Sequence, residues 1–154
     1  MDLKSRAIAT ENAIKSGAKI IDIVGPSYYL CNRKYDKFRE DIRVLKELCD
    51  QYSVSLRYFL EYRVFSYDLL YKAAQILLDN GIMTILPSTG YSLDEINDNI
   101  LASALINKKI PNIKIICNGN IWQSKHLVSI EKAGLYGVRV NSINGLELIA
   151  QNMI

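Results

Sequence analysis

The sequence predicts an α/β fold in which five parallel strands alternate with helices. Hydrophobic residues switch repeatedly between a helical and a strand period, and Gly17, Gly81 and Gly134 each separate a helix from the next strand. Strands joined through single helices run parallel, because each crossover returns the chain to the same end of the sheet. With 154 residues, we expect one domain that spans residues 1–154.

The expected elements follow one another with short loops. The strands are short, mostly apolar runs at 18–24, 54–61, 82–86, 112–117 and 136–140. The helices are expected at 3–16, 35–51, 66–79, about 92–107, 122–133 and 143–153. Ser66 is the expected N-cap of its helix, and Ser92 begins a capping-box pattern.

Composition and charge argue against several classes of protein. The net charge of +3 is small and the lysines are dispersed, so we expect no nucleic-acid-binding face. The sequence lacks a run of about 18 apolar residues and a signal sequence, so we expect no membrane span and a cytoplasmic location. His126 is the one histidine, and the three cysteines are far apart, so we expect no metal site and no cofactor.

Two architectures are built from such units: an open doubly wound sheet and a closed eight-strand barrel. Five strands suit the open sheet better, whereas the pattern of charges favours the barrel. Arg57, Phe59 and Glu61 share one face of their strand, and Asp22 lies in the middle of another apolar strand. Charges within a parallel sheet are costly unless they are paired, and a barrel interior that carries a polar site is one place where they persist.

Five ordered stretches carry a resemblance to a known family: SGAKIIDIVGP, LRYFLEY, ILPSTGY, IICNGNI and GVRVNSINGLELI. They resemble, in order and over residues 2–149, the strand ends of deoxyribose-phosphate aldolases. That family has a strand aspartate after a Gly-Ala turn, a lysine and glutamate strand, a Lys-Thr-Ser-Thr-Gly strand end, a lysine strand with a double glycine, and a final arginine strand. The resemblance implies a partial TIM-type barrel made of the C-terminal five β/α units, in a lineage of carbon–carbon lyases acting on a phosphosugar.

The resemblance also implies roles for the charged residues of the strands. Asp22 matches the proton-relay aspartate, and Glu61 matches the strand-end glutamate. Arg57 stands where the family has a buried lysine; arginine stays protonated, so it can orient or neutralise but cannot act as a base. We expect Asp22 and Arg57 to form an ion pair on the inner face of the sheet.

The two lysines of the imine chemistry are absent from their matching positions. The Schiff-base lysine falls on Leu86, and the lysine that lowers its pKa falls on Ile116. Neither side chain supplies the amine that an iminium intermediate requires. Lys114 lies two residues before Ile116, hence on the same strand face, and is a candidate for a relocated catalytic amine.

The family's phosphate site is matched in part. Trp122 replaces its arginine, and the double glycine has become Gly119-Asn120, so the charge complementarity is weaker. The residues that could still meet a phosphate through backbone N–H groups and hydroxyls are Ser88, Thr89, Gly90, Gly119, Asn120 and Ser142.

The function therefore stays open between three hypotheses, and so does the question of whether the chain is an enzyme. The first is an aldolase-like protein of phosphosugar lyase lineage, impaired or inactive by the imine route. The second is a non-catalytic subunit or binding module that pairs with a partner chain through open sheet edges. The third is an enzyme that uses Asp22 and Glu61 for enolisation without an imine. Because five strands cannot close an eight-strand barrel, we expect a homo-oligomer or a partner chain; a truncated product is a further possibility.

Overall fold

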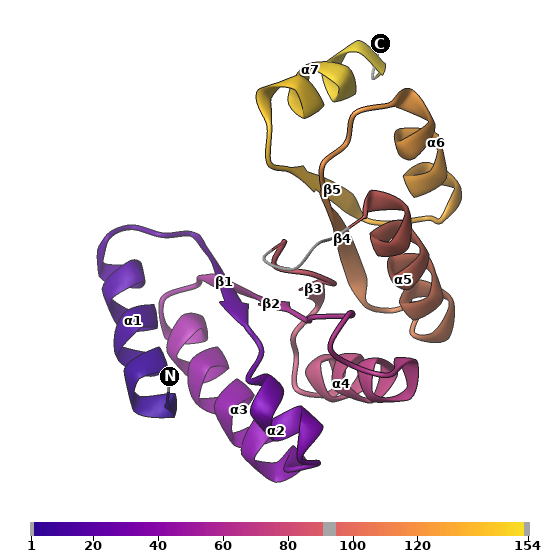
Figure 1. Ribbon diagram of the computed structural model, residues 1–154. Coiled ribbons are helices and arrows are strands. Elements are labelled where there is room, and N and C mark those ends of the chain that lie inside the picture. Colours follow the sequence, from indigo (N-terminus) through magenta and orange to yellow (C-terminus); the bar gives the residue numbers. More distant parts are fainter. Residues whose placement is uncertain (1, 91–94, 153–154) are drawn as a thin grey trace.

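The computed structural model describes residues 2–90 and 95–152 (Figure 1). In this part of the chain five strands form one parallel sheet in chain order, β1-β2-β3-β4-β5. They are β1 (Ile20–Val24), β2 (Ser55–Phe59), β3 (Thr84–Leu86), β4 (Lys114–Gly119) and β5 (Gly137–Val140). The predicted α/β fold is confirmed. The sequential order also decides between the two architectures, because a doubly wound sheet reverses its strand order at a switch point.

Helices flank the sheet on its outer side, and the inner face stays open (Figure 1). They are α1 (Leu3–Lys15), α2 (Ser27–Cys31), α3 (Tyr35–Gln51), α4 (Tyr67–Asp79), α5 (Ile96–Lys109), α6 (Ser124–Lys132) and α7 (Ile143–Asn152). The short helix α2 was not predicted, because five residues after Pro26 are too few to show a helical period.

The helix caps agree in part with the prediction. Ser66 caps α4 as expected, and its Oγ accepts a hydrogen bond from the Leu69 amide at 3.4 Å. The capping box expected at Ser92 lies outside the described residues. Two lysines end α5, where a positive charge stabilises the C-terminus of a helix.

The largest core lies between the sheet and helices α3 and α4. Fully buried residues of these helices, of the strands and of the turn before β3 contribute to it, among them Phe38, Ile42, Leu45, Tyr58, Leu70, Leu77, Ile82 and Ile85. A smaller cluster joins α5, β4 and α6: Ile96, Ile100, Cys117, Ile121 and Ile130. Alternation along each strand therefore sends the other side chains to the inner face.

Two general features of the described residues concern function. None of their helices is both long and apolar enough to cross a membrane. Within the same residues, no three His, Cys, Asp or Glu side chains come together as a possible metal site. His126 is buried in α6, with its ring against Trp122 at 5.4 Å between centroids.

Candidate functional site

The inner face of the sheet carries a bidentate ion pair between its first two strands. Asp22 of β1 lies opposite Arg57 of β2 in the parallel register. Arg57 Nε donates to Asp22 Oδ1 at 2.5 Å, and its Nη2 donates to Oδ2 at 2.8 Å. Both side chains are about one-fifth exposed, at 21% and 23%. The ion pair expected from the sequence is present, on the face that the alternation predicted.

A second arginine reaches the same carboxylate from the far end of the sheet. Arg139 of β5 places Nη1 at 3.7 Å from Asp22 Oδ2, and its guanidinium carbon lies 5.3 Å from the centre of the Phe59 ring. Its side chain is 55% exposed. Sequence analysis did not single out Arg139, although GVRV was one of the stretches that carried the resemblance. The alternation of side chains along 137–140 was the signal that could have placed Arg139 on the inner face.

Two guanidiniums lie near the single carboxylate of Asp22, so this cluster of three groups carries a net positive charge. Arg57 binds Asp22 through two hydrogen bonds, whereas Arg139 approaches it only through Nη1, at 3.7 Å, and has four further N–H donors. An arginine with donors to spare beside a cavity is well suited to bind an oxyanion.

A small cavity of about 140 Å³ lies beside Arg139, where β3, β4 and β5 end. Its described lining comprises Thr89, Gly90, Asn118, Gly119, Arg139, Val140 and Asn141. Sequence analysis predicted Thr89, Gly90 and Gly119 here and missed the other four. The carboxyl ends of parallel strands are where ligands of α/β barrels bind.

Two of the lining residues have backbones that favour glycine. Gly90 has φ 80° and Gly119 has φ 154°. A Cβ on Gly119 would also approach Ile96 Cδ1 to 3.1 Å. Glycine at these positions allows the backbone to come close to a ligand.

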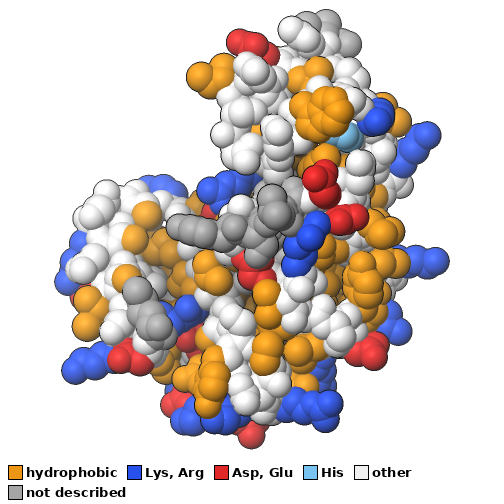
Figure 2. Space-filling view, in the orientation of Figure 1, with side chains coloured by type: hydrophobic (Ala, Val, Ile, Leu, Met, Phe, Trp, Pro, Cys, Tyr) orange, Lys and Arg blue, Asp and Glu red, His pale blue; other side chains and the backbone are white. Residues whose placement is uncertain are grey.

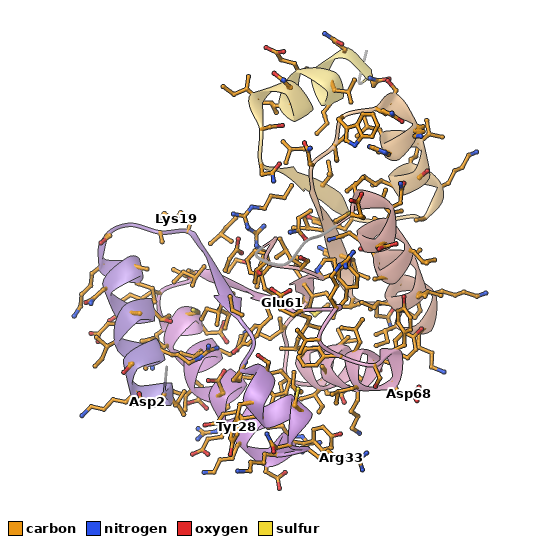
Figure 3. All side chains as sticks on the ribbon, viewed as in Figure 1. Asp2, Lys19, Tyr28, Arg33, Glu61 and Asp68 are labelled. Carbon is orange, nitrogen blue, oxygen red and sulfur yellow. The ribbon has the colours of Figure 1, made fainter. Side chains whose placement is uncertain are left out.

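A network beneath the cavity holds the loop after β3. Ser88 is buried, and its Oγ accepts a hydrogen bond from the Gly90 amide at 3.0 Å. Asn118 Nδ2 donates to the Ser88 carbonyl at 2.6 Å. Glu61, in the middle of the molecule in Figure 3, accepts a hydrogen bond through Oε1 from the Thr89 amide at 2.9 Å. Ser88 and Glu61 thus shape the loop that lines the cavity.

Among the residues predicted as phosphate ligands or as a relocated amine, three neither line the cavity nor join this network. Lys114 begins β4, about 16 Å from Gly119 at the strand's rise per residue, and its Nζ lies 4.6 Å from the centre of the Tyr136 ring. Ser142 Oγ accepts a hydrogen bond from the Gly145 amide at 3.1 Å, at the start of α7. Asn120 is exposed and lies outside the described lining. The strand register places Lys114 opposite Thr84, at the level of Asp22 and Arg57 and not at the level of the cavity. Its role as a relocated catalytic amine stays a prediction.

The floor of the inner face is apolar. Phe59, Leu86 and Ile116 pack together as a separate cluster, with exposed fractions of 7%, 0% and 9%. Leu86 pairs with Phe59 in the register of β2 and β3. Along β2, the Asp22–Arg57 pair lies two residues before this hydrophobic contact, toward the amino ends of the strands.

Comparison with known proteins places this geometry in context. No family model matches the sequence. A deoxyribose-phosphate aldolase of Mannheimia succiniciproducens is 25% identical over 146 residues, which cover 94% of this chain and 62% of that protein. The solved structure of QR15, an aldolase, superposes with a TM-score of 0.85 at 20% identity, over 99% of this chain and 69% of the other.

The chain has the fold of a deoxyribose-phosphate aldolase. The tetrameric deoxyribose-phosphate aldolase of Aeropyrum pernix gives a TM-score of 0.79 at 14% identity, over 99% of this chain and 63% of that one. The chain thus spans about 62% of the length of the curated relative, and its five strands form a part of the aldolase barrel.

Proposed function

We propose that this aldolase-like chain binds a phosphosugar and derives from a carbon–carbon lyase lineage, but does not operate by the imine route. The observation that carries the proposal is Arg139, half-exposed beside a small cavity lined by Gly90 and Gly119. The Arg139 guanidinium can pair with a phosphate, and the glycine backbones at 90 and 119 allow the phosphate to come close, although the Gly90 amide itself donates to Ser88 Oγ.

The apolar floor supports the loss of imine chemistry. Leu86 and Ile116 occupy the positions that match the family's two lysines, and both are buried against Phe59. The described lining of the cavity contains no lysine. Without an amine at the reacting carbon no Schiff base forms, and the substrate carbonyl is not activated.

The hydrogen-bond partners of the carboxylates argue against the enolisation hypothesis. Asp22 is held by Arg57 through both oxygens, and Glu61 accepts the Thr89 amide. A general base needs a lone pair within reach of the substrate proton. Asp22 meets a ligand only after its pair with Arg57 opens, so the geometry favours binding over proton abstraction.

The binding proposal is tested with deoxyribose 5-phosphate in calorimetric titrations. We expect Arg139→Gln to weaken binding about tenfold or more, because a charge-assisted contact to the phosphate is lost. Arg33→Gln is the matched control: Arg33 lies in the α2–α3 loop, outside the described lining of the cavity, and should leave the affinity unchanged. Equal affinities for Arg139→Gln and the unmodified chain would refute the proposed site.

The covalent route is tested by borohydride reduction in the presence of the same sugar phosphate. The mass of the unmodified chain should stay the same. Leu86→Lys restores an amine at the matching position and should give a reduced adduct, provided that its circular dichroism shows a folded chain. An adduct on the unmodified chain, especially at Lys114, would mean that a relocated amine performs the chemistry.

A second candidate function is a non-catalytic subunit that pairs with a partner chain. The observation in its favour is that β1 and β5 end the sheet, so that each has one side without a neighbouring strand in the described residues. Unpaired strand edges recruit another strand unless they are covered. The two candidates are compatible, because the cavity beside Arg139 and the free edge of β1 are different surfaces.

A further inference from the structure

Asn118 is a buried polar residue of the cavity wall to which the proposed function gives no role. Its neighbour Cys117 packs with Ile96 in the cluster between β4 and the helices, so alternation along β4 turns Asn118 to the inner face. Only 7% of Asn118 is exposed, and the register of β4 and β5 places it beside Arg139. An amide side chain is therefore buried next to the guanidinium at the cavity.

The orientation of the Asn118 amide follows from its hydrogen bond. Nδ2 donates to the Ser88 carbonyl at 2.6 Å, and an oxygen in that place would face another acceptor. The oxygen of a planar amide diverges from its nitrogen, so Oδ1 is turned away from Ser88, toward the side of β4 on which β5 and Arg139 lie. Within the described residues, Oδ1 is buried and accepts no hydrogen bond. Such an acceptor costs free energy unless a ligand supplies a donor.

Two backbone amides of the loop after β3 are engaged within the protein. The Thr89 amide donates to Glu61 Oε1, and the Gly90 amide donates to Ser88 Oγ. These N–H groups are therefore already occupied when an anion enters the cavity. Recognition of the anion then depends on the side chains of the wall, the guanidinium as a donor and the Asn118 amide oxygen as an acceptor.

The size of the cavity limits which ligand group can reach this acceptor. The cavity measures about 140 Å³. A protein cavity of about 150 Å³ holds one molecule of benzene, so this one has room for a single tetrahedral oxyanion but not for a whole sugar phosphate. The donor that meets Asn118 therefore belongs to the oxyanion itself. In Figure 2 the surface is hollowed between the lobe that carries α1 and the lobe that carries α7, and Lys or Arg side chains border this hollow.

We infer that the cavity selects an oxyanion that carries its own O–H group, either inorganic phosphate or a phosphate ester in its singly protonated form. Arg139 donates to the ionised oxygens, and the protonated oxygen donates to Asn118 Oδ1. A fully ionised oxyanion places a lone pair against that acceptor and is rejected. The inference rests on the proposed function, because it uses the same anion site beside Arg139, and it names the form of phosphate that the site takes.

Inorganic phosphate and sulfate test the inference in calorimetric titrations of the full chain at pH 7. The two anions have the same tetrahedral shape, but only phosphate carries an O–H group at this pH. A guanidinium alone would bind sulfate at least as well, because sulfate carries the full double negative charge. We expect phosphate to bind about tenfold tighter or more. Equal affinities, a preference for sulfate or no binding of phosphate would overturn the inference.

Variants of two asparagines assign the preference to the acceptor. Asn118→Leu removes Oδ1 and should reduce the ratio of the two affinities to about one. Asn80→Leu is the matched control: Asn80 Nδ2 donates to the Ile76 carbonyl at 2.7 Å, outside the described lining of the cavity, so a similar hydrogen bond is lost and the ratio should persist. A preference for phosphate that survives in Asn118→Leu, with a folded chain by circular dichroism, contradicts the inference.

Asn118→Asp serves where the leucine variant does not fold. It keeps an acceptor at the same position and adds a negative charge, so the ratio in favour of phosphate should rise; a fall would count against the inference.

Arg139→Gln separates this inference from the proposed function. It should weaken phosphate and sulfate alike, because both anions pair with the guanidinium. If the two anions bind equally and both lose affinity in Arg139→Gln, the anion site stands and the role of Asn118 is refuted. The proposed function is judged by deoxyribose 5-phosphate, and it fails if Arg139→Gln leaves the affinity for that ligand unchanged.

Discussion

The two ends of the sheet differ in how much core supports them. Around β1–β3, helices α3 and α4 bury a large continuous cluster that includes Leu45 and Leu77. Around β4 and β5 the cluster with Ile130 is small, and large apolar side chains such as Trp122 and Ile143 are exposed. The first region is therefore the stable scaffold, and the second, which supplies Arg139, is the more easily opened. Ligand-binding segments are commonly drawn from the less stable parts of a fold.

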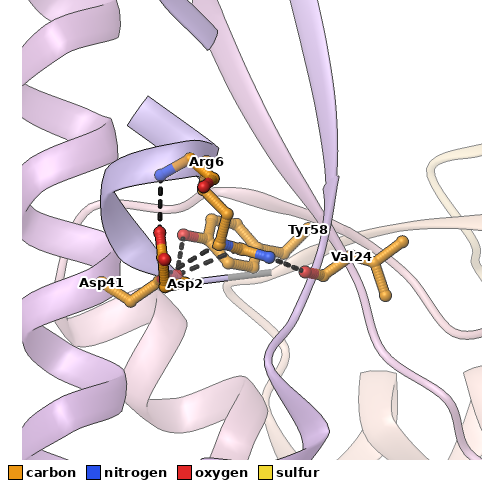
Figure 4. Close-up of polar contacts among 6 residues, drawn as sticks. Asp2, Arg6, Val24, Asp41 and Tyr58 are labelled. Atoms are coloured by element: carbon orange, nitrogen blue, oxygen red, sulfur yellow. Dashed lines mark hydrogen bonds and ion pairs between the residues drawn. The ribbon is translucent and has the colours of Figure 1, made fainter. Parts of the chain in front are cut away.

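The buried polar groups of the region around β1–β3 also differ from those of the region around β4 and β5. In the first region Asp41 is buried, ion-paired with Arg6 at 2.9 Å, and accepts a hydrogen bond from the Tyr58 hydroxyl at 3.2 Å (Figure 4). Burial raises the pKa of the Asp41 carboxyl, and burial together with the nearby carboxylate raises the pKa of Tyr58. In the second region both ring nitrogens of buried His126 lack a hydrogen-bond partner. Among the described residues, Arg6 Nε and Asp41 Oδ1 likewise make no hydrogen bond, but they pair with each other by charge, whereas the His126 imidazole has no such partner.

The largest expected effect comes from cavities in the two cores. Leu45→Ala should lower the free energy of unfolding by about 3–4 kcal/mol, because it opens a cavity in a fully buried site. Ile130→Ala should cost less, about 2 kcal/mol, since the smaller cluster can collapse around the gap. Urea unfolding measures both. Equal costs would mean that the two regions are equally well packed.

Hydrogen exchange sharpens that comparison. Ile130→Ala should speed exchange in α6 and β5 while α3 keeps its protection, because local opening affects the weaker unit first. Uniform acceleration across the chain would show a single cooperative unit instead.

The next effect concerns the two arginines on the inner face. Arg57→Gln should destabilise the chain by about 1–2 kcal/mol, between the values for exposed and buried pairs, because it leaves Asp22 with only a distant partner. Arg139→Gln should change stability by less than about 0.5 kcal/mol. Thermal and urea unfolding of both variants measures these two changes in stability. A larger loss for Arg139→Gln would make it a structural rather than a ligand-binding residue.

The smallest effect is the pH dependence of His126. Burial, with a lesser contribution from nearby Lys125, lowers the pKa of this imidazole below its ordinary value of 6.5. The folded state thus favours the neutral ring. Its contribution to stability is complete above pH 6.5 and is lost as the pH falls from 6.5 through the lowered folded pKa. His126→Phe should remove this part of the acid sensitivity, seen as a smaller drop in unfolding free energy between pH 8 and pH 5. An unchanged drop would assign the sensitivity to other groups.

Much of the fold could be predicted because hydrophobic period and glycine positions are local signals. The five strands were each found within a few residues of their observed bounds, and the Asp22–Arg57 pair followed from alternation along two strands. The short helix α2 was not predicted, because five residues are too few to show a helical period of hydrophobic residues. Arg139 and Asn118 were not predicted for another reason. Their partners, Asp22 and the Ser88 carbonyl, lie far from them in the sequence.

The sequence by itself determined the order of strands and helices, the parallel direction of the sheet and the side chains that share its inner face. These depend on neighbours a few residues away, through the periods of helices and strands. Only the tertiary structure decided that Arg139 of β5 reaches Asp22 of β1, that Lys114 lies far from the cavity, and that α1 stands off from β1 and leaves a groove. Those facts depend on the curvature of the whole sheet, because the distance between its first and last strands is set by every strand between them.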